Sequence, residues 1–129
     1  MSQRSFPVPE ANEESEAFWA AVEEERLPCG YCRSCGAWHW YPRAICPHCH
    51  SDEVELRDTG GLGEIYTFSV MRRVPEPWAI AYVTLDEGVT MMTNIVDCDL
   101  DALAIGQRVR VRFVTAEDGS SKVPCFAPL

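Results

Sequence analysis

The chain is poor in positive charge, lacks a long apolar run, and confines its three histidines to residues 39–50. Eleven Lys and Arg residues stand against 20 Asp and Glu residues, which gives a formal net charge of −9. This balance argues against a surface for nucleic acid, because phosphate would be repelled. No apolar stretch approaches the roughly 20 residues that cross a bilayer, so we expect no membrane partner. The rest of the chain therefore has no histidine that could serve as a general acid or base.

The sequence also lacks signs of export. Residues 1–9 are polar and contain two prolines, unlike the apolar core of a secretory signal. Seven cysteines is an odd number, and nothing indicates an oxidising compartment, so a disulfide framework is disfavoured. We therefore expect a cytoplasmic protein. With 129 residues, 47% of them hydrophobic, the chain suits one domain or two small modules that share a core.

Four cysteines in two CxxC pairs form the most specific motif. Cys32 and Cys35 make the first pair, and Cys46 and Cys49 make the second after ten intervening residues. Gly36 follows the first pair, where a glycine lets the chain turn while backbone amides point at sulfur. A redox CxxC usually opens a helix, which the nearby prolines oppose. The spacing predicts a structural zinc held by four thiolates.

Cys29 leaves one alternative open, because Cys29 and Cys32 also form a CxxC pair. Zinc would tolerate the longer gap to Cys46 that this choice creates. We prefer Cys35 as the ligand because Gly36 occupies the position after it. Since four cysteines complete the shell, the three histidines are expected outside it: His39, His48 and His50.

No catalytic residue is predicted. Cys98 and Cys125 are the remaining thiols, and no histidine in that half of the chain could deprotonate them. Asp97 and Asp99 flank Cys98, and their charges raise a thiol pKa. Zinc with four thiolates has no open coordination position for Lewis-acid work. The sequence therefore indicates a protein that is not an enzyme by itself.

The first 28 residues predict an acidic arm and a short helix. Asn12 is expected to cap the helix, and Pro28 is expected to end it. Phe18, Trp19 and Val22 form one narrow apolar stripe at helical spacing. Two interpretations of this stripe are equally favoured. Phe18 and Trp19 pack on the protein's own core, or they dock on another protein.

From Gly60 onward the apolar pattern alternates, as in strands. Tyr66, Phe68 and Val70 fall on one face of the first strand, and Ile65 falls on the other. The stretch from Ser51 to Asp58 reads as a polar link. The predicted fold is mainly β: a helical arm over residues 1–28, a rubredoxin-like zinc ribbon over 29–59, and a five-stranded OB-type barrel over 60–129. The expected strands cover residues 64–72, 78–85, 89–96, 107–114 and 123–126.

Five arginines lie near the first and fourth of these strands. Such a row is commonly a solvated strand face. Alternatively, planar guanidinium groups suit the phosphate of a nucleotide-like cofactor or a carboxylate on a partner. The candidates for an anion site, either CoA or a partner anion, are Arg72, Arg73, Arg108, Arg110 and Arg112.

The order of these motifs resembles the zinc-ribbon plus OB-fold proteins of domain-of-unknown-function family 35. Cys29 is not required by the family pattern. The matching segments run along nearly the whole chain: Phe18-Trp19, Cys32-x2-Cys35-Gly36, Pro42-Arg43, Cys46-Pro47-x-Cys49, Gly63-Glu64-Ile65-Tyr66-Thr67-Phe68, Leu85-Asp86-Glu87-Gly88, Ile105-Gly106-Gln107-x-Val109 and Pro124-x-Phe126-x-Pro128.

The resemblance implies a helper of acyl-CoA chemistry. Members of the family associate with thiolase-fold enzymes in isoprenoid precursor synthesis or steroid side-chain breakdown. They help to form the acyl-CoA passage or support a retro-aldol step on a CoA thioester. For this chain it implies an accessory subunit in a hetero-oligomer, with structural zinc and a CoA thioester shared with the partner.

A barrel of this type raises the alternative of a single-stranded nucleic-acid binder, which needs a basic groove with exposed aromatics. The barrel segment, residues 60–129, contains nine acids and six bases, so we expect no such binding. In a gel-shift assay at low salt, micromolar protein should leave a single-stranded oligonucleotide unshifted. A shift that weakens with added salt would favour the nucleic-acid interpretation.

Overall fold

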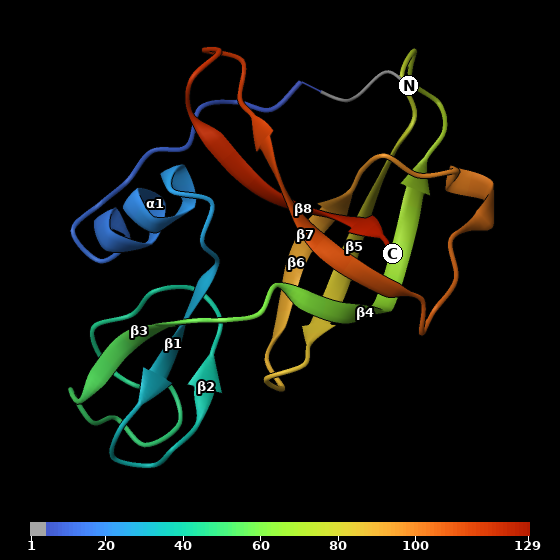
Figure 1. Cartoon of the computed structure of the whole chain (residues 1–129). Coiled ribbons are helices and arrows are strands. Elements are labelled where there is room, and N and C mark those ends of the chain that lie inside the picture. The colour runs from blue at the N-terminus through green and yellow to red at the C-terminus, as the bar shows by residue number, and fades with distance from the viewer. Residues whose placement is uncertain (1–4) are drawn as a thin grey trace.

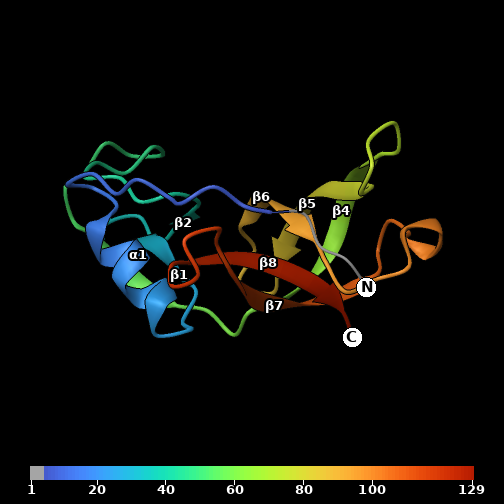
Figure 2. The same cartoon turned by 90° about the horizontal axis from the view of Figure 1, so that it is seen from above.

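The computed structural model describes residues 5–129, which form two lobes side by side (Figures 1 and 2). One lobe holds the helix and a small sheet, and the other is a barrel. The helix is α1 (Glu16–Glu23), and η1 (Leu100–Ala102) is a single 3-10 turn. The strands are β1 (Pro28–Cys32), β2 (Trp38–His39), β3 (Val54–Asp58), β4 (Leu62–Met71), β5 (Trp78–Leu85), β6 (Thr90–Ile95), β7 (Arg108–Thr115) and β8 (Lys122–Pro128).

Helix α1 is shorter than the sequence predicted at both ends. Ser15, not Asn12, is the N-cap, and Asn12 Oδ1 accepts the Ser15 amide at 3.0 Å in a turn before the helix. At the other end Glu25 takes a left-handed conformation with φ 58°, and the Arg26 amide donates to the Ala21 carbonyl. This reversal ends the helix at Glu23, so Pro28 instead begins a strand.

The small sheet has the order β2-β1-β3 and is antiparallel throughout. Its strand β3 lies within the stretch that the sequence suggested was a polar link, and that prediction was wrong. All five residues of β3 pair with β1, from Pro28 opposite Asp58 to Cys32 opposite Val54. Leu56 packs against the core. Val54 and Leu56 alternate with charged residues, so a weak strand signal was present.

The second lobe is a closed five-stranded barrel with the order β4-β5-β6-β8-β7. Neighbouring strands are antiparallel except for β6 and β8, which meet in parallel at Ile95 and Phe126. That single parallel contact closes the barrel, and a long connection containing η1 precedes β7. The mainly β fold and the five-stranded barrel are confirmed.

A bulge in β4 changes which side chains of that strand face inward. The pairing of β4 with β5 shifts between Ile65 and Thr67, which leaves Tyr66 as the extra residue. Ile65 is buried before the bulge, whereas Phe68 packs inward after it. The predicted grouping of Tyr66 with Phe68 is therefore wrong, because strict alternation fails at a bulge. Tyr66 points outward and is 65% exposed.

One apolar core spans both lobes. Phe18 and Val22 of α1 and Cys29 of β1 belong to the same buried cluster as Val83 and Phe126 of the barrel. Helix α1 also contacts β8 directly, and the Lys122 amide donates to the Glu23 carboxylate at 3.1 Å. The main apolar core is therefore shared by the two lobes.

The segment before α1 runs along the barrel, as Figure 2 shows in blue. Phe6 is buried in a second apolar cluster with Val96, Val114 and Cys125. The Phe6 carbonyl accepts the Glu117 amide at 2.9 Å, at the turn between β7 and β8. This segment ties the start of the described chain to the barrel at the turn between β7 and β8.

Because the core is shared, we expect the two lobes to unfold together. Phe18 is 1% exposed, so Phe18→Ala should lower the free energy of unfolding by about 3–5 kcal/mol. Chemical denaturation followed by tryptophan fluorescence and by circular dichroism should give one coincident transition for both proteins. Ile105→Ala, at a side chain that is 70% exposed, is the control and should change stability little. Two separate transitions in the wild type would contradict the shared core.

Candidate functional site

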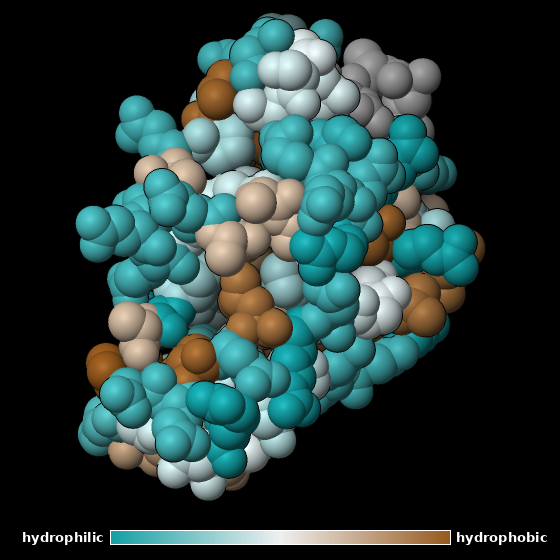
Figure 3. Space-filling model, turned by 60° about the vertical axis from the view of Figure 1, so that its left-hand side comes forward, coloured by the Kyte–Doolittle hydropathy of each residue, from teal (hydrophilic) through white to brown (hydrophobic). Residues whose placement is uncertain are grey.

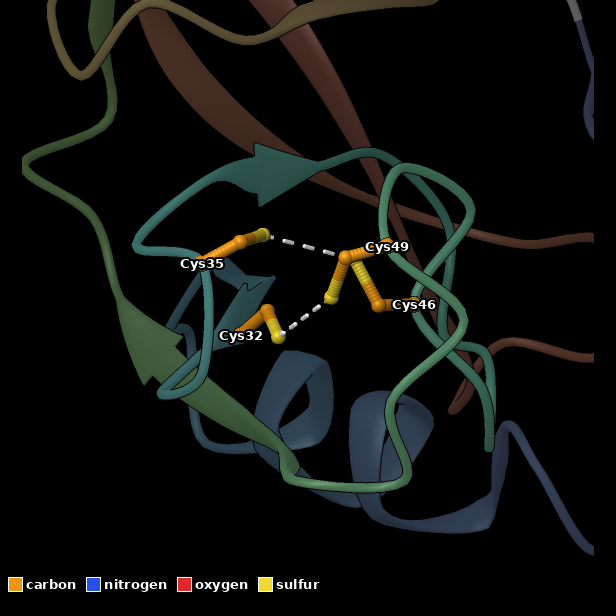
Figure 4. A group of neighbouring side chains, drawn as sticks. All are labelled: Cys32, Cys35, Cys46 and Cys49. Atoms are coloured by element: carbon orange, nitrogen blue, oxygen red, sulfur yellow. Dashed lines mark hydrogen bonds between the residues drawn. The ribbon is translucent and has the colours of Figure 1, made fainter.

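Four cysteine sulfurs converge between two loops of the small sheet lobe (Figure 4). Cys32 ends β1, Cys35 lies in the turn after it, and Cys46 and Cys49 come from the loop before β3. The sulfurs all lie within 4.8 Å of one another, with Cys32 and Cys49 at 3.6 Å and Cys35 and Cys46 at 3.8 Å. A tetrahedron of sulfurs at the usual Zn–S distance of about 2.3 Å has edges of about 3.8 Å. The geometry therefore fits a zinc ion.

The two CxxC turns have the same backbone design. The Gly36 amide donates to the Cys32 carbonyl at 2.8 Å, and the His50 amide donates to the Cys46 carbonyl at 3.0 Å. Gly36 and His50 both adopt left-handed conformations, with φ of 76° and 65°. Glycine meets this requirement without strain at the first turn, whereas histidine accepts some strain at the second. In each turn the reversal brings two sulfurs to the same side of the loop.

The electrostatics of the cluster favour a cation among the sulfurs. Burial opposes a Cys46 thiolate, but the amides of Cys49 and His48 donate toward its sulfur and lower its pKa to about 6. The Ser51 amide favours a Cys49 thiolate, yet burial and the neighbouring sulfurs raise that pKa to about 12. Adjacent thiolates repel one another, so a positive ion among them would stabilise their charged forms. A divalent metal that prefers thiolates meets this need.

Cys29 lies outside the cluster, which answers the question that the overlapping CxxC pair raised. It is 1% exposed and packs in the shared core, and burial raises its pKa to about 12. Cys29 and Cys32 stand three residues apart on β1, so they point to opposite faces of the sheet. One face of β1 thus serves the sulfur cluster and the other serves the core.

The histidines also lie outside the sulfur cluster. His39 pairs with Gly30 across the sheet, and its ring occupies the space that a side chain on Gly30 would need. It is 4% exposed, burial lowers its pKa, and neither ring nitrogen has a hydrogen-bond partner among residues 5–129. His48 Nε2 lies 3.3 Å from the Trp38 carbonyl oxygen, and His50 provides the second left-handed position.

The structure does not bring the five arginines into one site. Arg108, Arg110 and Arg112 follow one another along β7, with Arg110 opposite the first residue of β4. Arg72 and Arg73 come after the last residue of that ten-residue strand. The two groups therefore lie at opposite ends of β4.

Three of these arginines are already paired with acids. Arg108 holds Asp86 through two hydrogen bonds of 2.8 and 3.0 Å. Arg72 pairs with Asp101 at 2.9 Å, and Arg112 pairs with Asp97 at 2.7 Å. Among residues 5–129, Arg73 and Arg110 have no ion pair. Surface pairs of this kind contribute little stability, but they neutralise charge that would otherwise attract an anion.

The two aromatic residues of α1 differ in exposure. Phe18 is buried, and its ring packs edge-on against Trp19 and Trp40 with ring centres 5.0 and 5.4 Å away. Trp19 is half-buried, and its indole nitrogen donates to the Tyr41 hydroxyl at 3.3 Å. Phe18 thus packs on the protein's own core, and Trp19 is the one of the pair that reaches the surface.

The two remaining thiols lie in the barrel half and are buried. Cys98 is 8% exposed, and burial together with Asp99 and Asp97 raises its pKa. Cys125 is fully buried in the cluster that holds Phe6. Neither thiol combines exposure with a nearby group that would favour its thiolate.

Sequence reasoning did not single out one further surface, the outer side of β4, β5 and β6. Tyr66, Tyr82 and Met92 are exposed there on three neighbouring strands. The signal was available, because residues 65–71, 78–85 and 90–95 contain no charged residue. On the side of the molecule shown in Figure 3, by contrast, hydrophilic residues cover most of the surface and hydrophobic ones form small separate areas.

The sheet with its four-cysteine cluster and the closed barrel define a zinc-ribbon protein with an OB fold. Residues 19–55 match the family described as "ChsH2, rubredoxin-like zinc ribbon domain". Residues 56–114 match "ChsH2, C-terminal OB-fold domain". A DUF35 domain-containing scaffold protein of Methanocaldococcus jannaschii is 33% identical over 114 residues, which cover 81% of each protein. The chain belongs to the DUF35 family, which confirms the resemblance drawn from the motifs.

One similar protein carries a name from acyl-CoA chemistry. A probable enoyl-CoA hydratase alpha subunit of Thermomonospora curvata is 29% identical over 127 residues. That match covers 95% of this chain and 40% of that protein, so this chain spans less than half of its length.

Two solved structures are similar in fold. A chain of the structure described as "Ltp2-ChsH2(DUF35) aldolase" superposes with a TM-score of 0.83 at 28% identity, over 93% of this chain and 98% of that one. A DUF35 protein of Sulfolobus solfataricus has a TM-score of 0.66 at 11% identity, over 92% of this chain and 87% of its own, and shows the fold alone. In the part of the chain that the structure describes, no helix is long and apolar enough to span a membrane.

The position of Cys29 gives a direct test of the ligand set. Cys32→Ser should lower the zinc content of the purified protein well below one ion per chain, because it removes one of four ligands. Cys29→Ser should retain zinc at the wild-type level, although it should lower stability through its buried position. Metal content per chain, measured by mass spectrometry of the dissolved metal, distinguishes the two. Loss of zinc in Cys29→Ser with full zinc in Cys35→Ser would show that the first CxxC pair was assigned wrongly.

Proposed function

We propose that this chain is a non-catalytic accessory subunit that binds a thiolase-fold acyl-CoA enzyme and helps it to handle a CoA thioester. The reaction class is acyl transfer or retro-aldol cleavage. The observation that carries the proposal is the similarity, over 93% of the chain, to a chain of the Ltp2-ChsH2(DUF35) aldolase. The relative named as an enoyl-CoA hydratase subunit points to the same class of substrate.

The sites of the chain support a helper better than a catalyst. Its four-cysteine cluster offers zinc a closed shell, in which the metal would hold the two loops together and leave no position for substrate. Its barrel thiols are buried, and its one buried imidazole, His39, packs against Gly30 away from any nucleophile. An acyl-transfer site needs a nucleophile and a base within hydrogen-bond reach, and among the described residues we find none.

A CoA thioester carries phosphates, so the arginines remain candidates for contact with it. Arg73 and Arg110 are the two that could receive an anion without breaking an ion pair present in the isolated chain. The other three would have to exchange Asp86, Asp97 or Asp101 for the new anion. In this proposal the partner supplies the reacting groups and this chain supplies at most one guanidinium at each end of β4. A cytoplasmic setting, where thiols stay reduced, accompanies it.

Affinity purification from the native host tests the proposal. A tag placed after Leu129, which is 65% exposed, should recover an aldolase, thiolase or hydratase-type enzyme in near-equal amount, identified by mass spectrometry. The recovered enzyme should turn over its CoA thioester faster with this chain than without it. The chain alone should show no turnover, and Cys98→Ser should leave the activity of the complex unchanged.

The control is the same tag on an unrelated acidic protein of similar size. Recovery of no acyl-CoA enzyme, or an enzyme whose turnover does not depend on this chain, would overturn the accessory role. Turnover by the chain alone would instead overturn the non-catalytic part of the proposal.

A further inference from the structure

The outer side of β4, β5 and β6 carries a single charged residue, Glu64, near the start of β4. We call this outer side the tyrosine face and define its centre as Tyr66, Tyr82 and Met92, which are 65%, 46% and 53% exposed. These three residues come from neighbouring strands: Tyr82 lies opposite Met92, and Tyr66 is the bulged residue beside it. The face continues along the strands through Ile80 and Met71.

Charged residues are unevenly distributed around the barrel. Charged residues make up 24% of the chain, yet residues 65–71, 78–85 and 90–95 contain none. Three arginines stand on β7 and two follow β4. The acids of the barrel stand in the turns and connections, for example Asp86 and Asp97, except Glu64, which is the one charged residue of β4, β5 and β6. A barrel wall that only met water would gain solubility from charges on these outward positions. The wall is instead built from Tyr, Met, Ile and hydroxyl side chains.

This composition is that of the centre of a protein–protein interface. Such centres are depleted in Asp, Glu and Lys and enriched in Tyr, Trp and Met. From strand spacing and rise, three strands of about seven residues give a face of about 10 Å by 20 Å. That area is about a quarter of the roughly 800 Å² that each partner buries in a standard interface, so a surrounding polar rim would supply the rest.

The bulge keeps Tyr66 and Phe68 on different faces of β4. Ile65 is buried, so alternation alone points Tyr66 outward, and it would point Phe68 outward as well. The shift between Ile65 and Thr67 adds one residue to the strand, so Thr67 is exposed like Tyr66, whereas Phe68 packs into the core. The bulge thus lets the outer wall carry Tyr66 beside Tyr82 without exposing Phe68.

The net charge of the protein and the lack of cations on the tyrosine face favour one kind of binding partner over the others. A second copy would bring together two proteins of net charge −9, which repel one another. Single-stranded nucleic acid would stack on tyrosines, but it also needs cations along its backbone, and the face has none. An uncharged apolar surface on a different protein meets neither obstacle.

We infer that the tyrosine face docks on the acyl-CoA enzyme of the proposed function, with Tyr82 at the centre of the contact. This inference rests on that proposed function and adds the surface through which it works. An aromatic side chain in the middle of an uncharged patch is the usual place for a dominant contact. The polar side chains of the rim, Thr84 and Asn94 among them, would surround it.

The test compares charges placed on and off this face. Tyr82→Arg and Met92→Lys each put a cation into the proposed contact without touching the core, because both side chains point outward. Ile105→Arg is the matched control, since it changes an equally apolar, 70% exposed side chain on the connection before β7. Affinity for the recovered enzyme is measured by calorimetry or surface binding. Zinc content and melting temperature of each variant establish that it is folded.

We expect Tyr82→Arg and Met92→Lys to bind the enzyme about thirtyfold or more weakly, and Ile105→Arg to bind like wild type. If all three folded variants bind like wild type while the wild-type complex forms, the docking surface is wrong and the accessory role stands. If the wild type recovers no acyl-CoA enzyme, the accessory role fails and this inference fails with it.

Two further measurements identify other occupants. Light scattering of the purified chain reports self-association, and a wild-type dimer that Tyr82→Arg converts to a monomer would assign the face to a second copy. Fluorescence anisotropy with a single-stranded oligonucleotide reports nucleic acid, and binding lost in Tyr82→Arg would assign the face to that ligand. Either result would overturn the inference.

Discussion

Strand β1 is the element on which the rest of the structure depends. All five of its residues pair with β3 on one side, and Gly30 and Tyr31 pair with β2 on the other, so it is the centre of the small sheet. It carries Cys32 on one face, toward the sulfur cluster, and Cys29 on the other, toward the core that continues into the barrel. The alternation of a β-strand thus couples two environments three residues apart. A metal bound at the cluster would fix β1, and β1 in turn positions the ribbon against the barrel.

The overall architecture could be predicted because its signals are local. Two CxxC pairs and Gly36 define the first turn and the ligand set, and alternating apolar residues define the barrel strands. Asp86 to Gly88 mark a turn that forms as expected, with Gly88 at φ 101°. What failed depends on interactions between distant segments. The β3 strand needs β1 to pair with, so its two apolar residues gave only a weak pattern by themselves.

The bulge at Tyr66 and the ion pairs of the arginines could not be predicted from local sequence patterns for the same reason. Nothing in the residues around Tyr66 announces a bulge, which arises only when β4 is aligned with β5. Likewise the sequence suggests one basic row of arginines, whereas Asp86, Asp97 and Asp101 pair with three of them from turns 15 to 29 residues away along the chain. The cancellation of charge on a surface is a tertiary property. It separates Arg73 and Arg110 from the other three, a distinction that no spacing rule could make.

The contacts between the first helix and the last strand also affect how the chain acquires its structure during synthesis. Glu23 and Glu25 bind Lys122, from which they are separated by 99 and 97 residues. Strand β8, which α1 packs against, leaves the ribosome after the other seven strands. Phe18 can pack on Trp40 early, but the barrel side of the helix has no partner while nearly the whole barrel is made. Contacts this distant in sequence form slowly, and apolar surface exposed meanwhile is a target for chaperones. The zinc turns, closed by contacts within 17 residues, can form long before β8 reaches the helix.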